Sequence, residues 1–301
     1  MSLQAGAQTA RIKLGTATPG GGFPAYGAAF IEAVKRQDPA LEIEAINTKG
    51  STENVPLLRA SALDIALVQG EVASEALSDS GLAEGRLWII AAMYSTPGLF
   101  VVRADSACRA ISDLRGKPVA FGARGSGLVL LARAVLDGIG LDCDRDFDAV
   151  YLERAGDGPA MVLDGRVAAL WGGGMGWPGF KTVADSAAGA RFIAPSAAEI
   201  ARIRGRHPFL KPLALAAGSY KGQDTAIGSV GSWSLILARD GLEEATAYRL
   251  ARALHRAEAG LARRLPQARE TTAANTIAAA PRGALIHPGV QRYLREIGLV
   301  S

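Results

Sequence analysis

Apolar positions in the N-terminal third of the chain recur with two alternating periods. Short apolar runs, or runs that alternate apolar and polar residues, predict strands. Each is followed by a segment with apolar residues three or four positions apart, which predicts a helix. Successive units of this kind are typical of a doubly wound parallel sheet. The predicted strand and helix pairs are 11–16 with 24–35, 41–48 with 55–62, and 64–69 with 71–78.

The same alternation starts again after Arg103, which indicates a second lobe. The amphipathic segment near the C-terminus is expected to rejoin the first lobe. We therefore predict an α/β protein in which residues 1–103 and 225–301 form a discontinuous first lobe and residues 104–224 form the second. Each lobe is expected to be a mostly parallel sheet flanked by helices, with a ligand cleft between the lobes. The further strands expected are 88–93, 99–103, 118–122, 149–152, 168–171 and 229–238, and the further helices are 111–114, 129–137, 159–163 and 243–264.

Three glycine-rich turns each join a predicted strand to a predicted helix. The start of a helix leaves N–H groups unpaired and carries the positive end of the helix dipole, and glycines let a ligand approach the backbone closely. Because all three turns follow strands, we expect them to face the cleft and to hold one anionic ligand from several sides. The turns are Gly15-Thr-Ala-Thr-Pro-Gly-Gly-Gly22, Lys49-Gly-Ser-Thr-Glu-Asn54 and Gly122-Ala-Arg-Gly-Ser-Gly127.

Short neutral side chains near these turns can donate hydrogen bonds to such a ligand, and aromatic rings can form a wall. Arg124 is the one candidate that could pair a carboxylate through two parallel N–H groups. A glycine-rich segment, 172–179, is too rich in glycine to be a regular element and lies between two of the aromatic candidates. The candidate binding residues are Thr16, Thr18, Gly21, Phe23, Ser51, Asn54, Gln69, Arg124, Gly125, Ser126, Gly127, Trp171, Gly173 and Trp177.

Several of these candidates have a structural alternative that the sequence leaves open. Ser51 and Ser126 are equally placed to cap helices, which is a common role of serine at such positions. Arg124 could be a solvated loop charge, and Trp171 and Trp177 could be core residues.

Composition limits the class of protein and of partner. The 301 residues include 33 Lys and Arg against 29 Asp and Glu, a net charge of +4 that is spread along the chain, so we expect no nucleic-acid partner. The apolar runs are shorter than the roughly 20 residues of a membrane span, so we expect no transmembrane segment. The first ten residues lack the pattern of a secretory signal, so the protein is either cytoplasmic or has lost a leader. A disulfide between Cys108 and Cys143, the only cysteines, stays open.

The sequence does not have the residues of known enzyme motifs at the spacing that their chemistry requires. The sequence lacks a GxxxxGK[ST] phosphate loop, an HExxH zinc motif and a GxSxG elbow around Ser51 or Ser126. The first glycine turn does not match GxGxxG, so a dinucleotide site is not expected, and neither a cofactor nor a metal ion is predicted. The histidines, His207, His255 and His287, are expected to be structural.

The order and spacing of several short motifs resemble the TAXI family of solute-binding proteins that serve TRAP transporters. The similarity covers nearly the whole chain. The matching pieces are Gly15-Thr16 with the following glycines and aromatic residue, Gly50-Ser-Thr-Glu-Asn54, Asp64-Ile-Ala-Leu-Val-Gln69, Asp113-Leu-Arg-Gly-Lys117 leading into Gly125-Ser-Gly127, Tyr220-Lys-Gly222 and His287-Pro-Gly289.

This resemblance implies a periplasmic, two-lobed type II binding protein, not an enzyme, that closes on a small organic anion and delivers it to a TRAP-type membrane transporter. A removed leader and a monomer are expected. The ligands that the family implies are dicarboxylates or acidic amino acids such as glutamate and 2-oxoglutarate. The sequence departs from the family pattern at Leu128 and Arg124, and Trp171 and Trp177 flank a stretch that would suit a larger aromatic carboxylate. A ligand-sensing module for a signalling receptor is the other alternative.

Overall fold

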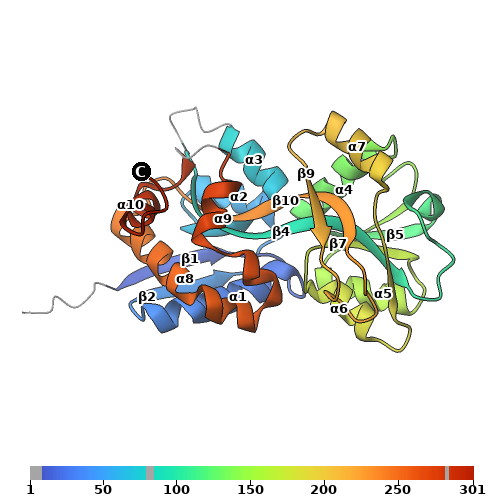
Figure 1. Ribbon diagram of the computed structural model, residues 1–301, viewed down its shortest axis with the longest axis horizontal. Helices are drawn as coiled ribbons and strands as arrows, with labels where there is room; N and C mark the ends of the chain where they lie inside the picture. The colour runs from blue at the N-terminus through green and yellow to red at the C-terminus, as the bar shows by residue number, and fades with distance from the viewer. Residues whose placement is uncertain (1–8, 79–84, 282–284) are drawn as a thin grey trace, which may run out of the picture.

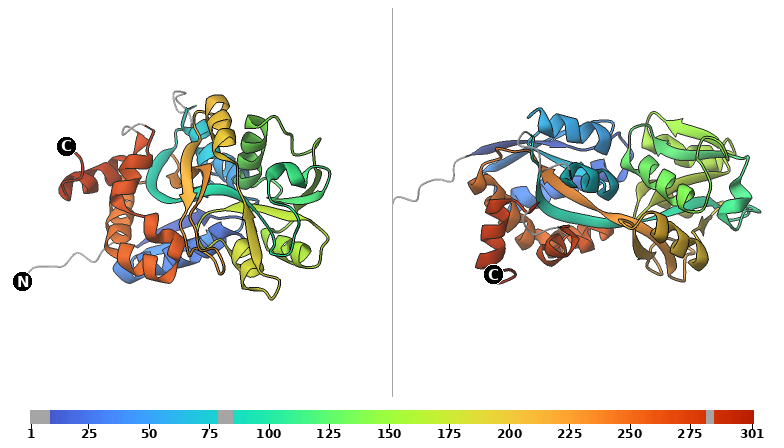
Figure 2. Two further views of the ribbon diagram at one scale, coloured as in Figure 1. Left: turned by 45° about the vertical axis from the view of Figure 1, so that its right-hand side comes forward. Right: turned by 90° about the horizontal axis from the view of Figure 1, so that it is seen from above.

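Two long antiparallel strands, β4 (Trp88–Arg103) and β10 (Ile227–Ala238), connect two α/β lobes in the computed structural model of the protein (Figure 1). The structure describes residues 9–78, 85–281 and 285–301. The strands of this described chain form one curled sheet in the order β2-β1-β3-β10-β4-β7-β5-β6, with β8 beside β4 and β9 beside β10. Figure 2 shows the two lobes side by side with β4 and β10 between them. The predicted two-lobed α/β fold is confirmed.

The first lobe contains the N-terminal units that the sequence predicts and the C-terminal helices that return to them. Strand β1 pairs in parallel with both β2 and β3, and β10 is antiparallel to β3, so the sheet is mixed at its centre and parallel at its edge. The elements are β1 (Ala10–Gly15), α1 (Gly22–Gln37), β2 (Leu41–Ile46), α2 (Ser51–Arg59), β3 (Ile65–Val68), α3 (Gly70–Ser78), α8 (Glu244–Arg264), the 3₁₀ turn η4 (Pro266–Glu270), α9 (Ala273–Ala279) and α10 (Pro288–Glu296).

The second lobe repeats this design. Strand β5 pairs in parallel with β6 and β7, whereas β7 and β8 are antiparallel to β4, and β9 is antiparallel to β10. The elements are η2 (Ile111–Leu114), β5 (Pro118–Ala123), α4 (Gly127–Gly138), β6 (Asp148–Leu152), η3 (Ala155–Asp157), α5 (Gly158–Leu163), β7 (Ala169–Gly173), α6 (Pro178–Asp185), β8 (Ala190–Ile193), α7 (Ala197–Arg206) and β9 (Lys211–Leu215).

Each of the two connecting strands contributes its residues to the core of one lobe at one end and to a core of the other lobe at the other end. In β4, Tyr94 belongs to the core of the first lobe and Leu99 to the second, and in β10 the exchange falls between Val230 and Leu235. The residues between these points include small and polar ones, such as Gly231, whose added Cβ would lie 1.9 Å from a backbone oxygen of the neighbouring strand. The lobe boundaries predicted at 103/104 and 224/225 stay a prediction.

Several predicted element boundaries are wrong. The strands expected at 88–93 and 99–103 are one strand, because Pro97 fits extended backbone and Gly231 opposite it leaves room for the proline. Helix α2 begins at Ser51 instead of Val55, so Pro56 lies inside the helix and not in its first turn. Helices α1 and α4 also begin earlier than predicted, at Gly22 and Gly127. The last residues of each glycine-rich turn therefore belong to a helix N-terminus.

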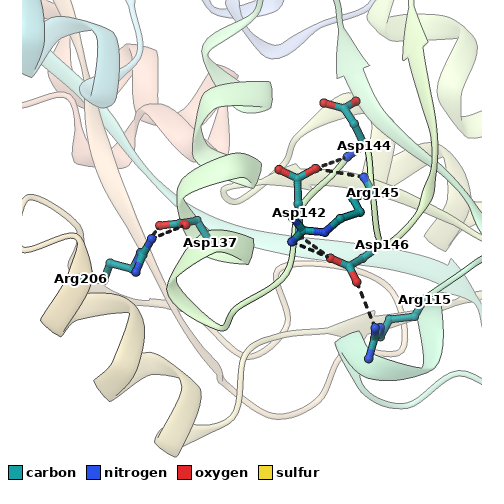
Figure 3. Close-up of polar contacts among 7 residues, drawn as sticks. All are labelled: Arg115, Asp137, Asp142, Asp144, Arg145, Asp146 and Arg206. Carbon is teal, nitrogen blue, oxygen red and sulfur yellow. Dashed lines mark hydrogen bonds and ion pairs between the residues drawn. The ribbon is translucent and has the colours of Figure 1, made fainter.

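Charged side chains in and near the loop before β6 have structural partners. In the loop before β6, Asp142 Oδ1 accepts hydrogen bonds from the backbone of Asp144 and Arg145, and Asp146 accepts one from the backbone of Asp142 and pairs with Arg115 (Figure 3). These carboxylates stabilise the loop, and the backbone bond from Asp142 is the main reason that the pKa of Asp146 is lowered.

The cysteines and histidines also lie in structural positions. Cys108 and Cys143 are free, buried thiols, which settles the question of a disulfide between them, and burial raises the pKa of Cys143 to about 12. His207 contacts Asp137, and His255 Nδ1 lies 2.8 Å from the Tyr293 hydroxyl. His287 caps α10 by accepting the Gly289 N–H. None of the helices in the described ranges is both long and apolar enough to cross a membrane.

The ion pair between Asp38 and Arg249 joins the end of α1 to α8. We expect this pair to contribute to the stability of the fold. Two hydrogen bonds of 2.7 and 2.8 Å link the largely buried side chains, and the bonded guanidinium holds the pKa of Asp38 below its usual value. We expect Asp38→Asn to lower the free energy of unfolding at pH 7 by about 1.5–3 kcal/mol. A lowered folded pKa gives stability that is present above the unfolded pKa of about 3.9 and is lost as the pH falls through the folded value.

Urea unfolding at pH 7 and at pH 3 measures this effect, and the difference between variant and parent should shrink at the lower pH. Glu42→Gln is the matched control, since Glu42 pairs with Arg11 on the surface, where side-chain exposures are 56% and 89%. Its cost should be below about 1 kcal/mol. Equal losses in the two variants would contradict the role assigned to the buried pair.

Candidate functional site

A cavity of about 60 Å³ lies between the two lobes. It is small beside the pockets of roughly 300–1,000 Å³ that enclose drug-sized ligands, so it suits a small molecule. Both lobes contribute to it, at the ends of β1, β3, β5 and β6 and within β4 and β7. The lining residues are Ala17, Thr18, Gly21, Gly22, Phe23, Gly50, Ser51, Gln69, Tyr94, Thr96, Gly122, Ala123, Ser126, Gly127, Leu128, Leu152, Ala155, Leu170, Gly173 and Trp177.

The N-termini of α1, α2 and α4 border this cavity. Their N-cap residues are Gly21, Gly50 and Ser126, and in none of the three does a side chain cap the helix. Gly50 has φ +115°, a backbone conformation that residues with a side chain rarely adopt. The first N–H groups of these helices, and the positive ends of their dipoles, therefore remain available to a ligand.

The N-termini of α2 and α4 belong to different lobes and nearly touch. A Cβ added to Gly50 would lie 3.3 Å from the Cα of Ser126. One added to Gly127 would lie 2.6 Å from Cβ of Gln69 and 3.1 Å from Oγ of Ser51. Glycine at position 127 is what allows α4 to approach the first lobe this closely.

Two polar atoms beside this contact have no hydrogen-bond partner within the described part of the protein: Gln69 Nε2 and Ser126 Oγ. Gln69 is only 4% exposed, and both residues line the cavity, one from each lobe. Buried donors without a partner are costly, so these two atoms are candidates for hydrogen bonds to a ligand. The alternative that Ser126 caps a helix through its side chain does not hold, because its hydroxyl makes no capping hydrogen bond to α4.

Ser51 is likewise not an N-cap, since Gly50 occupies that position. Its Oγ accepts the backbone N–H of Gln69 at 3.0 Å and so ties the end of β3 to the start of α2. The hydroxyl proton of Ser51 remains to be donated, and Ser51 lines the cavity.

Direct hydrogen bonds also cross the cleft. Thr52 Oγ1 donates to the Gly125 carbonyl at 2.5 Å, and the Ala155 N–H donates to Thr18 Oγ1 at 3.3 Å. Beside the second contact, Gly20 packs on Gly156 so closely that a Cβ at position 20 would meet its Cα at 2.5 Å. These contacts hold the lobes together around the cavity.

The aromatic wall depends on glycines and on one buried tyrosine. The Trp177 ring lies over Gly172 and Gly179, where an added Cβ would come within 2.4 Å and 2.3 Å of the ring. The backbone N–H of Trp177 donates to the Tyr220 hydroxyl, which donates in turn to the Gly174 carbonyl. The segment that looked irregular in the sequence thus positions an indole at the cavity.

Tyr94 adds a neutral polar group to the wall. Burial raises the pKa of its hydroxyl far above the ordinary value, so Tyr94 is a protonated donor at physiological pH. Its ring also packs on Tyr26, with ring centres 5.6 Å apart.

The structure brings nine of the fourteen predicted residues to the cavity: Thr18, Gly21, Phe23, Ser51, Gln69, Ser126, Gly127, Gly173 and Trp177. It places the other five elsewhere. Thr16 and Asn54 are buried behind the cavity, where Asn54 Nδ2 donates to the carbonyls of Thr16 and Leu67. Gly125 contributes its carbonyl to the contact across the cleft.

Trp171 and Arg124 also lie away from the cavity. Trp171 is fully buried in the second lobe, packs on Phe100 and donates its indole N–H to the Leu128 carbonyl. The Arg124 side chain is exposed, and its guanidinium lies 5.2 Å from the centre of the Tyr151 ring.

Sequence reasoning missed the apolar part of the lining and two polar groups, Tyr94 and Thr96. Leu128 directly follows the third glycine turn and was within reach of the same argument. Five others belong to the three glycine turns that the sequence places at the cleft, although none was named as a candidate: Ala17, Gly22, Gly50, Gly122 and Ala123. Tyr94, Thr96 and Leu170 lie within strands, Leu152 ends a strand and Ala155 follows it, and there the sequence pattern alone does not distinguish a cavity wall from the core. The lining residues missed are Ala17, Gly22, Gly50, Tyr94, Thr96, Gly122, Ala123, Leu128, Leu152, Ala155 and Leu170.

The fold is that of the two-lobed periplasmic binding proteins of type II. The chain belongs to the NMT1-like family, which it matches over residues 14–298. Among solved structures it is similar to a Bordetella bronchiseptica RB50 protein, with 13% identity over 96% of this chain and 98% of the other and a TM-score of 0.59.

Two further structures share the fold. A putative L-cystine ABC transporter from Listeria monocytogenes has 13% identity over 87% of this chain and 98% of its own, with a TM-score of 0.53. A Xanthomonas citri protein bound to ATP has 14% identity over 96% of each chain, with a TM-score of 0.51. Identities this low show a common architecture and do not transfer a ligand.

The close approach of Gly127 to Gln69 lets us predict how a side chain at position 127 would affect closure of the two lobes. We expect Gly127→Ala to keep the fold but to hold the lobes apart, because its Cβ would overlap Gln69. Ligand affinity should fall by roughly tenfold or more, since binding must then force the lobes past the obstruction. Small-angle scattering would show a larger radius of gyration than the parent has.

Gly205→Ala is the matched control, because Gly205 is exposed in α7 and an added Cβ meets nothing within 4 Å. It should leave scattering and affinity as they are. Parent-like closure in the Gly127 variant would contradict the assigned role.

Proposed function

We propose that the protein is an extracytoplasmic solute-binding protein, which captures a small organic anion by closure of its lobes and delivers it to a membrane transporter. The observation that carries this proposal is the cavity between the lobes, where α2 and α4 meet and the buried Gln69 Nε2 and Ser126 Oγ have no partner in the described chain. Neutral donors and helix N-termini stabilise an anion without a counter-ion of opposite charge.

Closure follows from the way in which the ligand would be held. Gln69 belongs to the first lobe and Ser126 to the second, so a ligand that contacts both favours the closed arrangement by its differential affinity. The contacts that cross the cleft, such as that of Thr52 with Gly125, are made only when the lobes are together. The small polar segment where the core changes lobes in β4 and β10 is the natural hinge.

The resemblance to the TAXI family supports a TRAP-type transporter as the partner, a periplasmic location and a monomer. The Listeria neighbour, titled a putative L-cystine ABC transporter, supports the general role of supplying a small solute to a membrane carrier. A binding protein releases its ligand unchanged, so this proposal excludes catalysis. Incubation of the protein with its ligand should therefore yield no product.

The test begins with the natural ligand. Mass spectrometry of small molecules released from freshly purified protein should find an organic anion, and calorimetry with that anion should give heat of binding. Small-angle scattering should show compaction when the anion is added. A protein that binds no organic anion and does not compact would refute the proposal.

Ser126→Ala separates binding from folding. The variant loses a hydroxyl that has no partner within the described protein, so we expect unchanged thermal stability and ligand affinity weaker by about 1–3 kcal/mol. Ser112→Ala, a change at an exposed serine of η2, is the matched control and should leave both quantities unaltered. Unchanged affinity in the Ser126 variant would remove this hydroxyl from the site.

A further inference from the structure

The side chains that line the cavity carry no formal charge, within the described ranges of the chain. Its polar members are Thr18, Ser51, Gln69, Thr96 and Ser126, together with Tyr94, and the remainder are glycine, alanine, leucine, phenylalanine and tryptophan. The only titratable side chain in this set is Tyr94, which burial keeps protonated.

We propose, on the basis of the function proposed above, that the ligand is a monoanion with one carboxylate or sulfonate head, a compact apolar body, and neither an ammonium group nor a second anionic group. The dicarboxylates and acidic amino acids that the family resemblance implies are then disfavoured at this site.

The head group belongs at the junction of α2 and α4. Ser51, Gln69 and Ser126 lie within a few ångströms of Gly127 or Gly50 there, and two helix N-termini meet. Each helix end is equivalent to about half a positive charge. Two such ends, with donors from Gln69 Nε2 and the serine hydroxyls, match the charge of a single anionic head and leave little for a second.

The rest of the cavity suits an uncharged body. Leu128, Leu152, Leu170 and Trp177 line it from the second lobe, and Phe23 lines it from the first. A charged group placed among these side chains would lose its hydration without gaining an opposite charge, which is strongly unfavourable. An ammonium group would in addition need a carboxylate, and neither Asp nor Glu lines the cavity in the described chain.

The charged side chains that are nearest to the lining residues along the sequence do not place a charge in the cavity. Glu71 follows Gln69 by two positions and its carboxyl interacts with the Gln69 side chain, but it does not line the cavity. The Ser232 hydroxyl donates to it at 2.7 Å, and it borders a separate groove. Burial raises the pKa of Glu71, which favours the neutral acid. Arg124 is exposed and stacks toward Tyr151.

Matched ligands on the whole protein test the inference by changing one group at a time. Butyrate, 2-aminobutyrate, succinate and butyramide share a short carbon chain and differ by an ammonium group, a second carboxylate, or loss of the head charge. In calorimetry we expect butyrate or propanesulfonate to bind at least tenfold more tightly than each of the other three. A series from acetate to hexanoate then sets the length of the body.

The outcomes separate this inference from the proposed function. If succinate, glutamate or 2-aminobutyrate binds tenfold more tightly than butyrate, the protein is still a binding protein for organic anions, but the monoanion assignment is overturned. If none of the anions binds, both proposals fail.

Three variants test the placement of charge. Ser126→Ala and Gln69→Leu should each weaken the best monoanion at least fivefold, and the serine variant keeps the test usable if the glutamine variant does not fold. Arg124→Ala should change the affinity less than twofold, because its guanidinium lies outside the cavity. A tenfold loss in Arg124→Ala would show a cationic clamp and overturn the inference.

Discussion

The meeting of two helix N-termini from different lobes is the contact on which the rest of the structure depends. Backbone N–H groups at a helix N-terminus can stabilise a negative charge, and two helices that begin close together add their contributions. Here α2 comes from one lobe and α4 from the other, and their first turns approach within van der Waals contact at Gly50 and Ser126. Side chains at Gly50 and Gly127 would prevent this contact, so the glycines are a condition of the site.

In the proposed function, binding and lobe movement are coupled by the same contact. The cavity has no complete set of donors in either lobe alone, since Gln69 and Ser51 are on one side and Ser126 is on the other. The lobes are joined through β4 and β10, whose small and polar residues at the crossing replace the large apolar residues on either side. If these strands are the hinge that we propose, its small core lets the ligand contacts decide between open and closed arrangements.

The sequence predicted much of the fold and part of the site, for identifiable reasons. Glycine turns after strands at residues 15–22, 49–54 and 122–127 point to helix N-termini at one edge of a sheet, and the structure brings residues of all three turns to the cavity. Arg124 and Trp171 were misjudged as lining because position in a loop or strand does not say which way a side chain points. The walls formed by Leu128, Leu152 and Leu170 have the same pattern as core residues.

The sequence by itself determined the local elements, the alternation that gives two α/β lobes, and the residues whose backbone can approach a ligand, because periodicity and glycine act over a few neighbouring positions. Only the tertiary structure decided that β4 is one continuous strand, that Trp177 lines the cavity while Trp171 does not, and that the lining carries no charge. These features depend on contacts between residues far apart in the chain, such as Gln69 with Gly127, and local sequence patterns hold no information about such contacts.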